Sequence, residues 1–146
     1  MLHRNVIFRG ADVIPYAISS LDVRNQKEFF DQLDAACVEP CEVLTIPHNT
    51  NYSWGLAFSR TDEDGSAYSS DDLERRSRIE RLFEVTQQKG ASECQISVGA
   101  SDEDCDYGIM FPPCKGPDDQ RCARDSSFLR NILLDGLALG TEKAAN

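Results

Sequence analysis

The spacing of apolar residues in the first third of the chain predicts a strand, a helix and a second strand. Residues 4–9 form a short apolar-rich stretch that is typical of a strand. Asn25 and Glu28 have the spacing of a capping box, and the apolar positions that follow recur at helical intervals, so we expect a helix over residues 26–37 that Pro40 ends. Residues 42–46 are rich in β-branched side chains and predict a strand that Pro47 stops.

The remaining elements are less regular. A charged segment that Ser70 caps predicts a second helix, and residues 82–87 resemble a third strand. Residues 89–121 show no convincing period and predict a long irregular loop rich in cysteine. Asp125 is expected to cap a last helix that Gly140 ends, with a broad apolar face made of Phe128, Leu129, Ile132, Leu133, Leu137 and Leu139.

These elements predict an α/β fold built from strand–helix–strand units. Such units imply a parallel sheet, in which the loops after the carboxyl ends of the strands are the usual place for chemistry. His48 stands directly after the strand at residues 42–46, in the polar segment IPHNTN. It is therefore the first candidate for a functional side chain.

Composition and charge limit the possible functions. The 146 residues fit one globular domain, and the net charge of −10 disfavours a nucleic-acid-binding protein because phosphate backbones are repelled. Since no apolar stretch approaches the roughly 20 residues of a membrane-spanning helix, we expect no membrane span. The chain also carries no recognisable signal peptide.

Six cysteines are many for a cytosolic chain of this size. Their even number, with four of them in the irregular segment, favours disulfides, although the sequence does not give the pairing. A zinc site lacks the close Cys-x2-Cys pair and neighbouring histidine that such sites use, and buried free thiols are a third interpretation. Disulfides favour an exported or periplasmic location.

His48 has two interpretations that the sequence alone does not separate. Its ring nitrogen can bind a metal ion or a substrate, with the amides of Asn49 and Asn51 orienting the ring, or it can simply hydrogen-bond the backbone of its own turn. His3 precedes the first strand and is the second candidate. Glu84 interrupts an apolar segment, so it needs a partner if that segment is buried and faces solvent otherwise. No nucleophile motif or phosphate-binding glycine loop accompanies these residues.

The blocks HRNVIFR, CEVLTIPHNTNYSWG, LFEVTQQKGASEC and SSFLRNILLDGLALG resemble, in this order, a bacterial family of unassigned function. That family is similar to the PHP (polymerase and histidinol phosphatase) superfamily of metal-dependent phosphoesterases. The resemblance covers nearly the whole chain and implies part of a distorted β/α barrel.

The resemblance also implies a chemistry. It makes His48 and His3 metal ligands, places Glu84 and Glu93 at acidic positions of the catalytic site, and implies divalent ions such as zinc, manganese or iron. The expected reaction is hydrolysis of a small-molecule phosphate ester or related ester by metal-activated water.

The chain departs from that resemblance in two places. Members of the family begin with an H-x-H pair and continue after the last helix to a D-x-H pair, and neither occurs here. We therefore expect residues 1–146 to be a single partial domain, a middle fragment of a larger barrel with little or no activity in isolation. The alternative is a non-catalytic, disulfide-stapled binding or interaction module.

Overall fold

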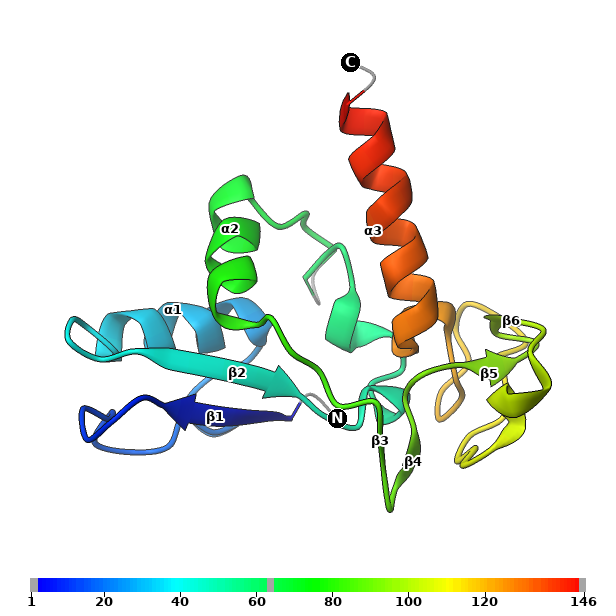
Figure 1. Cartoon of the computed structure of the whole chain (residues 1–146), viewed down its shortest axis with the longest axis horizontal. Coiled ribbons are helices and arrows are strands. Elements are labelled where there is room, and N and C mark those ends of the chain that lie inside the picture. Colours follow the sequence, from blue (N-terminus) through cyan, green and yellow to red (C-terminus); the bar gives the residue numbers. More distant parts are fainter. Residues whose placement is uncertain (1–2, 63–64, 145–146) are drawn as a thin grey trace. The chain divides into compact units, whose positions relative to one another are not determined.

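The computed structural model describes residues 3–62 and 65–144, and the side chains of the last helix as far as Ala138. The fold is small and mixed α/β, with three α-helices and sheets of two strands each (Figure 1). The described residues form no closed barrel. The chain divides into two compact units: unit 1 contains Met1–His3, His48–Ser59 and Glu84–Asn146, and unit 2 contains Arg4–Pro47 and Arg60–Phe83.

Unit 2 contains the two longest strands. Strand β1 (Arg4–Phe8) pairs with β2 (Val43–Pro47) over five residues, close to the predicted ranges. The pairing is antiparallel, so the expected parallel sheet was wrong. Phe8 at the end of β1 lies opposite Val43 at the start of β2. The connection between the two strands therefore begins and ends at the same end of the sheet.

The helix of this connection confirms the capping prediction. Helix α1 (Gln26–Ala36) begins after Asn25, whose side chain accepts a hydrogen bond from the Glu28 backbone N–H at 2.8 Å. The helix ends at Ala36, so Pro40 lies beyond its end. Its buried face contains Phe30 and Leu33, which are 5% and 0% exposed.

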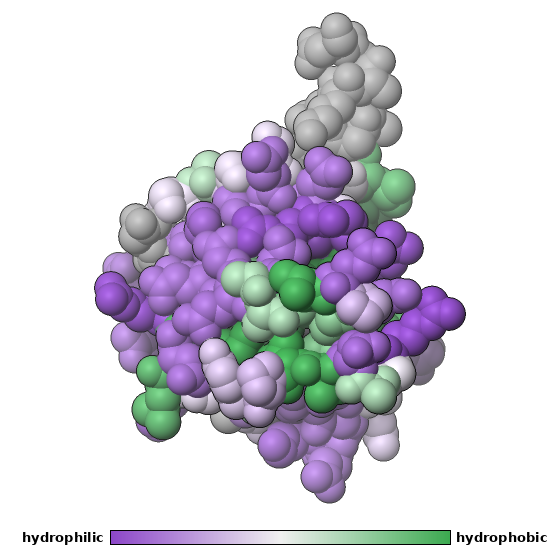
Figure 2. All heavy atoms as spheres, turned by 90° about the vertical axis from the view of Figure 1, so that its left-hand side faces the viewer, coloured by the Kyte–Doolittle hydropathy of each residue, from purple (hydrophilic) through white to green (hydrophobic). Residues whose placement is uncertain are grey.

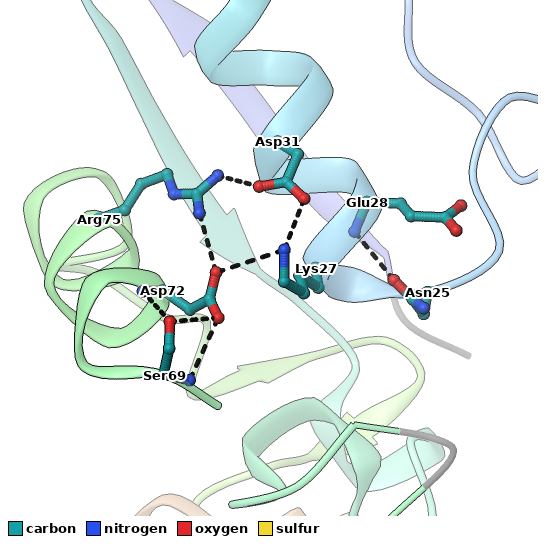
Figure 3. Close-up of polar contacts among 7 residues, drawn as sticks. All are labelled: Asn25, Lys27, Glu28, Asp31, Ser69, Asp72 and Arg75. Atoms are coloured by element: carbon teal, nitrogen blue, oxygen red, sulfur yellow. Dashed lines mark hydrogen bonds and ion pairs between the residues drawn. The ribbon is translucent and has the colours of Figure 1, made fainter. Parts of the chain in front are cut away.

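Helix α2 (Ser70–Ile79) is joined to α1 by charge rather than by apolar packing. Its cap is Ser69, one residue before the predicted cap, and Ser69 and Asp72 form a capping box. Figure 3 shows how Lys27 and Arg75 each contact the carboxylates of both Asp31 and Asp72. The four side chains alternate in sign, so each charge is compensated by neighbours on both helices.

A buried ion pair lies beneath these helices. The Arg4 guanidinium donates to Glu80 at 2.5 Å, and both side chains are 4% exposed. Arg76 also donates to Glu80 at 2.6 Å, and the Arg4 guanidinium lies 5.1 Å from the centre of the Phe30 ring. Removing either partner would leave a buried charge uncompensated, so this contact fixes how α2 ends against β1 and α1.

Unit 1 consists of short strands and 3-10 turns, followed by the last helix. Strands β3 (Thr86–Gln87) and β4 (Gly90–Ala91) form an antiparallel hairpin, and β5 (Gln95–Ile96) pairs in parallel with β6 (Gly99–Ala100). The expected strand over 82–87 is thus reduced to its last two residues. Leu82, Phe83 and Val85, which the apolar pattern placed in that strand, are exposed. The 3-10 turns Thr50–Tyr52, Leu56–Phe58, Glu103–Asp106 and Asp125–Ser127 complete this unit before the last helix.

Helix α3 (Leu129–Ala144) differs from its prediction at both ends. Asp125 starts a 3-10 turn instead of capping the helix, and the helix continues through Gly140. Phe128 and Leu129 are buried at 2% and 3%, whereas Leu133 and Leu137 are 54% and 68% exposed. Only the start of the predicted apolar face is therefore covered, and Leu139 lies beyond the side chains that the structure describes.

All six cysteines form disulfides, which confirms that interpretation and excludes a cysteine zinc site. The pairs are Cys37–Cys41 in unit 2, and Cys94–Cys105 and Cys114–Cys122 in unit 1.

Apolar side chains also reach the surface, and Figure 2 shows several of them gathered near the centre of one face, surrounded by hydrophilic residues. None of the helices within the described ranges has the length and apolarity needed to cross a bilayer.

Candidate functional site

The antiparallel register brings the two histidines of the chain together. Arg4 lies opposite Pro47, and one step further along the chain the His48 backbone N–H donates to the His3 carbonyl at 3.2 Å. The two imidazole rings lie beside each other, with centroids 5.5 Å apart and their planes inclined by 45°. In a parallel sheet the start of β1 and the end of β2 would lie at opposite edges, so the sequence-based topology would have kept these rings apart.

A carboxylate joins this pair from a third segment. Glu84 Oε2 lies 4.0 Å from His48 Nδ1, with the two side chains 30% and 20% exposed. Gln87, on β3, donates from Nε2 to the same Glu84 oxygen at 2.5 Å and lies 3.5 Å from His48 Nδ1. Residues from the chain start, the β2 end and the approach to β3 therefore converge, and we call His3, His48, Asn49, Glu84 and Gln87 the histidine site.

Asn49 contacts the His48 ring directly. Its backbone is left-handed, with φ of 54°, a conformation that asparagine adopts more readily than most residues. The side chain is 1% exposed, and its Nδ2 lies 2.9 Å from His48 Nδ1. Asn49 Oδ1 is buried without a hydrogen-bond partner among the described atoms. A buried amide oxygen without a partner costs free energy, so the fold keeps Asn49 beside the ring at some expense of stability.

Asn51 holds the nearby backbone rather than the ring. Its Nδ2 donates to the Lys89 carbonyl at 3.0 Å, and its Oδ1 accepts from the Ser92 hydroxyl at 3.1 Å. Ser92 Oγ in turn accepts from the Asn51 backbone N–H. Gly90 packs beside this amide with φ of 99°, where an added Cβ would lie 2.5 Å from the Gly108 carbonyl. Asn51 thus fixes the β3–β4 hairpin that carries Gln87.

Glu93 is engaged elsewhere in unit 1. Its Oε1 accepts from Arg130 Nε at 2.9 Å and Nη2 at 2.6 Å, and Arg130 also pairs with Asp102 at 2.6 Å. The Glu93 side chain is 45% exposed. Its ion-pair partner is therefore a surface arginine, and the structure does not bring Glu93 to the histidines.

His3 has a lowered pKa. Partial desolvation of the ring lowers the pKa of His3 below its ordinary value of 6.5, and the nearby His48 and Lys89 lower it further. All three effects disfavour the charged imidazolium. The neutral ring, which has a free lone pair, is consequently favoured over a wider pH range than in a free histidine.

Comparison with known proteins supplies the family. A family model described as "Protein of unknown function (DUF3604)" matches residues 1–146. The chain belongs to the DUF3604 family. Neither the curated proteins nor the solved structures contain a match to it.

The side chains of the histidine site in this DUF3604 chain are of kinds that bind metal ions, but they do not make up a full set of ligands. Two imidazoles and a carboxylate are common ligands of zinc, manganese and iron. Yet no group of three or more His, Cys, Asp or Glu side chains in residues 3–62 and 65–144 is placed to hold such an ion. The described part of the DUF3604 chain does not form a finished metal site.

Sequence reasoning missed Gln87 in this DUF3604 chain. The sequence indicated no partner for Glu84. In the structure its carboxylate accepts a hydrogen bond from Gln87, three residues later on β3. The signal was the turn-and-glycine pattern QQKG, which is compatible with a hairpin that begins at Gln87. A hairpin at these residues places Gln87 on a strand, where its backbone position is fixed.

Proposed function

We propose that this chain contributes His3, His48 and Glu84 to the site of a metal-dependent hydrolase that acts on a phosphate ester or a related ester. The observation that carries the proposal is the convergence of the three side chains from segments far apart in sequence. The two rings are 5.5 Å apart and the carboxylate is 4.0 Å from one of them. The resemblance to the PHP superfamily supports the same class, in which zinc, manganese or iron ions activate water.

Each residue has a distinct role in this proposal. His3 and His48 offer ring nitrogens, and the lowered pKa of His3 favours the neutral form that metal ligands require. Glu84 adds negative charge beside them, and Asn49 orients the His48 ring. Because these side chains do not complete a ligand set, further ligands must come from residues outside this group. The chain by itself is then expected to show little or no hydrolysis.

The three disulfides favour a second candidate, a non-catalytic binding module. Cys94 and Cys105 are 4% and 1% exposed, so their bond cross-links an otherwise irregular segment from its buried side. In such a module the histidine site would be a structural contact with no metal affinity. The two candidates therefore differ in one measurable property, the binding of a divalent ion.

The deciding experiment is calorimetric titration of the oxidised chain with zinc, manganese and cobalt(II) ions. We expect binding that His48→Ala and Glu84→Gln each weaken at least about tenfold. Glu103→Gln is the matched control, because this exposed carboxylate of unit 1 lies in a separate 3-10 turn, and its binding should equal that of the wild type. Glu93→Gln, measured in parallel, tests the predicted role of that residue. Binding that is absent, or unchanged in His48→Ala, would overturn the proposal in favour of the binding module.

A further inference from the structure

The side chain that connects the acidic and basic parts of the histidine site is an uncharged amide. Gln87 Nε2 donates to Glu84 Oε2 at 2.5 Å and lies 3.5 Å from His48 Nδ1, while the carboxylate and the ring are 4.0 Å apart. Asn49 Nδ2 lies closer to His48 Nδ1, at 2.9 Å, and takes the single acceptor position of that nitrogen, so the short bond of Gln87 is the one to the Glu84 carboxylate. We propose that Gln87 is a positioning residue that holds the Glu84 carboxylate beside the His48 imidazole.

The backbone around Gln87 is built to keep this amide in place. Gln87 pairs with Gly90 across the β3–β4 hairpin. The hairpin is fixed at its turn by the hydrogen bond from Asn51 to the Lys89 carbonyl, and Gly90 is packed too tightly to accept a Cβ. Because the backbone of Gln87 is held in this way, only the side-chain rotamers remain to be fixed when the amide forms its contacts.

Glu93 shows what a different partner would do. Arg130 donates twice to Glu93 and compensates its charge, as expected of a structural ion pair. Gln87 directs Glu84 without compensating its charge, and a carboxylate has about four acceptor positions, of which the amide occupies one. Glu84 is thus oriented while it keeps its charge and further acceptor positions for a cation or a proton donor. This inference rests on the proposed function for its chemical meaning, but the contact itself can be tested separately.

The first test measures the contact in the metal-free chain by NMR of the glutamine side-chain amides. Gln87→Ala assigns the Gln87 signals by their loss, and Gln88, the exposed neighbour in the turn, supplies the matched comparison. We expect Glu84→Gln to shift the Gln87 amide protons upfield, because a carboxylate acceptor is replaced by a weaker neutral one, and to leave those of Gln88 in place. Gln87 signals that resemble those of Gln88 and do not respond to Glu84→Gln would overturn the inference.

The second test connects the contact to the site. Cobalt(II) affinity should fall about 10- to 100-fold in Gln87→Ala and remain at the wild-type value in Gln88→Ala, with the melting temperatures of both variants close to wild type. The swapped double variant Glu84→Gln/Gln87→Glu retains an amide–carboxylate pair but moves the charge, so its affinity should also be reduced. Wild-type affinity in Gln87→Ala would overturn the positioning role. If the wild-type chain binds no cobalt, the proposed function fails, and the NMR result alone then decides whether Gln87 holds Glu84.

Discussion

The two units of this chain are stabilised in different ways. Unit 2 has two α-helices and five-residue strands, and it contains a series of ion pairs, from the exposed network of Lys27 and Asp31 to the buried pair of Arg4 and Glu80. Unit 1 has helix α3, strands of two residues, 3-10 turns and two of the three disulfides. Its interior is rich in uncharged polar side chains, among them Asn49, Thr50, Asn51, Ser53, Ser92, Gln95 and Ser127.

The comparison shows where candidate chemistry is placed in this fold. Regular elements satisfy their own backbone, so their side chains are free to pack or to form ion pairs. Irregular loops need side-chain amides and hydroxyls to satisfy buried backbone groups, as Asn51 does for Lys89. The same loops carry His48, Asn49, Glu84 and Gln87. In unit 1 the residues that stabilise the loops and those of the candidate site are therefore neighbours.

The largest expected loss of stability comes from the small apolar core of unit 1. Phe128 packs with Val98 and Ala123 and is 2% exposed, so Phe128→Ala should reduce the free energy of unfolding of this unit by about 3–5 kcal/mol. Leu133→Ala, at a position 54% exposed, is the control and should change it by less than about 1 kcal/mol. Hydrogen exchange resolved by residue measures each unit separately. Equal losses in the two variants would contradict the burial pattern of α3.

The disulfides should rank next, with unit 1 affected more than unit 2. In the chain-entropy relation, the Cys94–Cys105 bond, separated by 11 residues, contributes about 3 kcal/mol. The Cys37–Cys41 bond, separated by 4 residues, contributes about 2 kcal/mol. Replacement of each pair by serine, followed by chemical denaturation with exchange detection, checks this order. A greater loss from the Cys37–Cys41 pair would mean that unit 2 depends on its disulfide more than its helices suggest.

A smaller effect is expected at the amide that fixes the hairpin. Asn51→Ala leaves the Lys89 carbonyl without its donor and the Ser92 O–H without its acceptor, which should destabilise unit 1 by about 1–3 kcal/mol. It should also move the Gln87 amide signals, because Gln87 lies in the same hairpin. Asn5→Ala, at an exposed position of β1, should change neither. Unmoved Gln87 signals in Asn51→Ala would show that the hairpin is held by other contacts.

Acid should destabilise the two units at different pH values. These changes in stability are the smallest that we predict. The pKa of Asp72 is lowered by the hydrogen bond from Ser69. Burial raises the pKa of Asp31, but hydrogen bonds from Lys27 and Arg75 lower it more. Both folded values lie below the ordinary 3.8, so the stability that these groups give unit 2 is complete above about pH 4 and is lost as the pH falls further.

The pKa of His3 is lowered from 6.5, so the unfolded chain takes up this proton first. The contribution of His3 to unit 1 is therefore lost as the pH falls below 6.5. His3→Gln should remove this early loss and leave that of unit 2 unchanged. A simultaneous decline of both units between pH 7 and 4, with and without His3, would contradict the assignment.

The regular part of the fold was predictable, because local signals determine it. The Asn25 cap and the apolar spacing of Phe29, Phe30 and Leu33 specify α1 nearly to the residue. Strand direction was not predictable, since it depends on where a connection of more than thirty residues returns. The even number of cysteines indicated disulfides, but the pairing depends on loop paths that have no periodic pattern.

Most residues of the candidate site could be predicted from the sequence, but their arrangement in space could not. His48, His3, Asn49 and Glu84 were recognised as residue types suited to metal or substrate binding, and the structure brings them together. Their proximity follows from the antiparallel register, which the sequence did not reveal. Glu93 was selected from the family resemblance alone, and Arg130, 37 residues away in the sequence, engages it.

The most direct test of the central claim is a crystal structure of the oxidised chain grown with zinc, with anomalous scattering recorded at the zinc absorption edge. The account predicts an anomalous peak within about 2.0–2.2 Å of a ring nitrogen of His48, with His3 or Glu84 as a further ligand. It also predicts that Gln87 remains hydrogen-bonded to Glu84. A map with no peak at the histidine site, or with zinc bound only elsewhere on the chain, would contradict it.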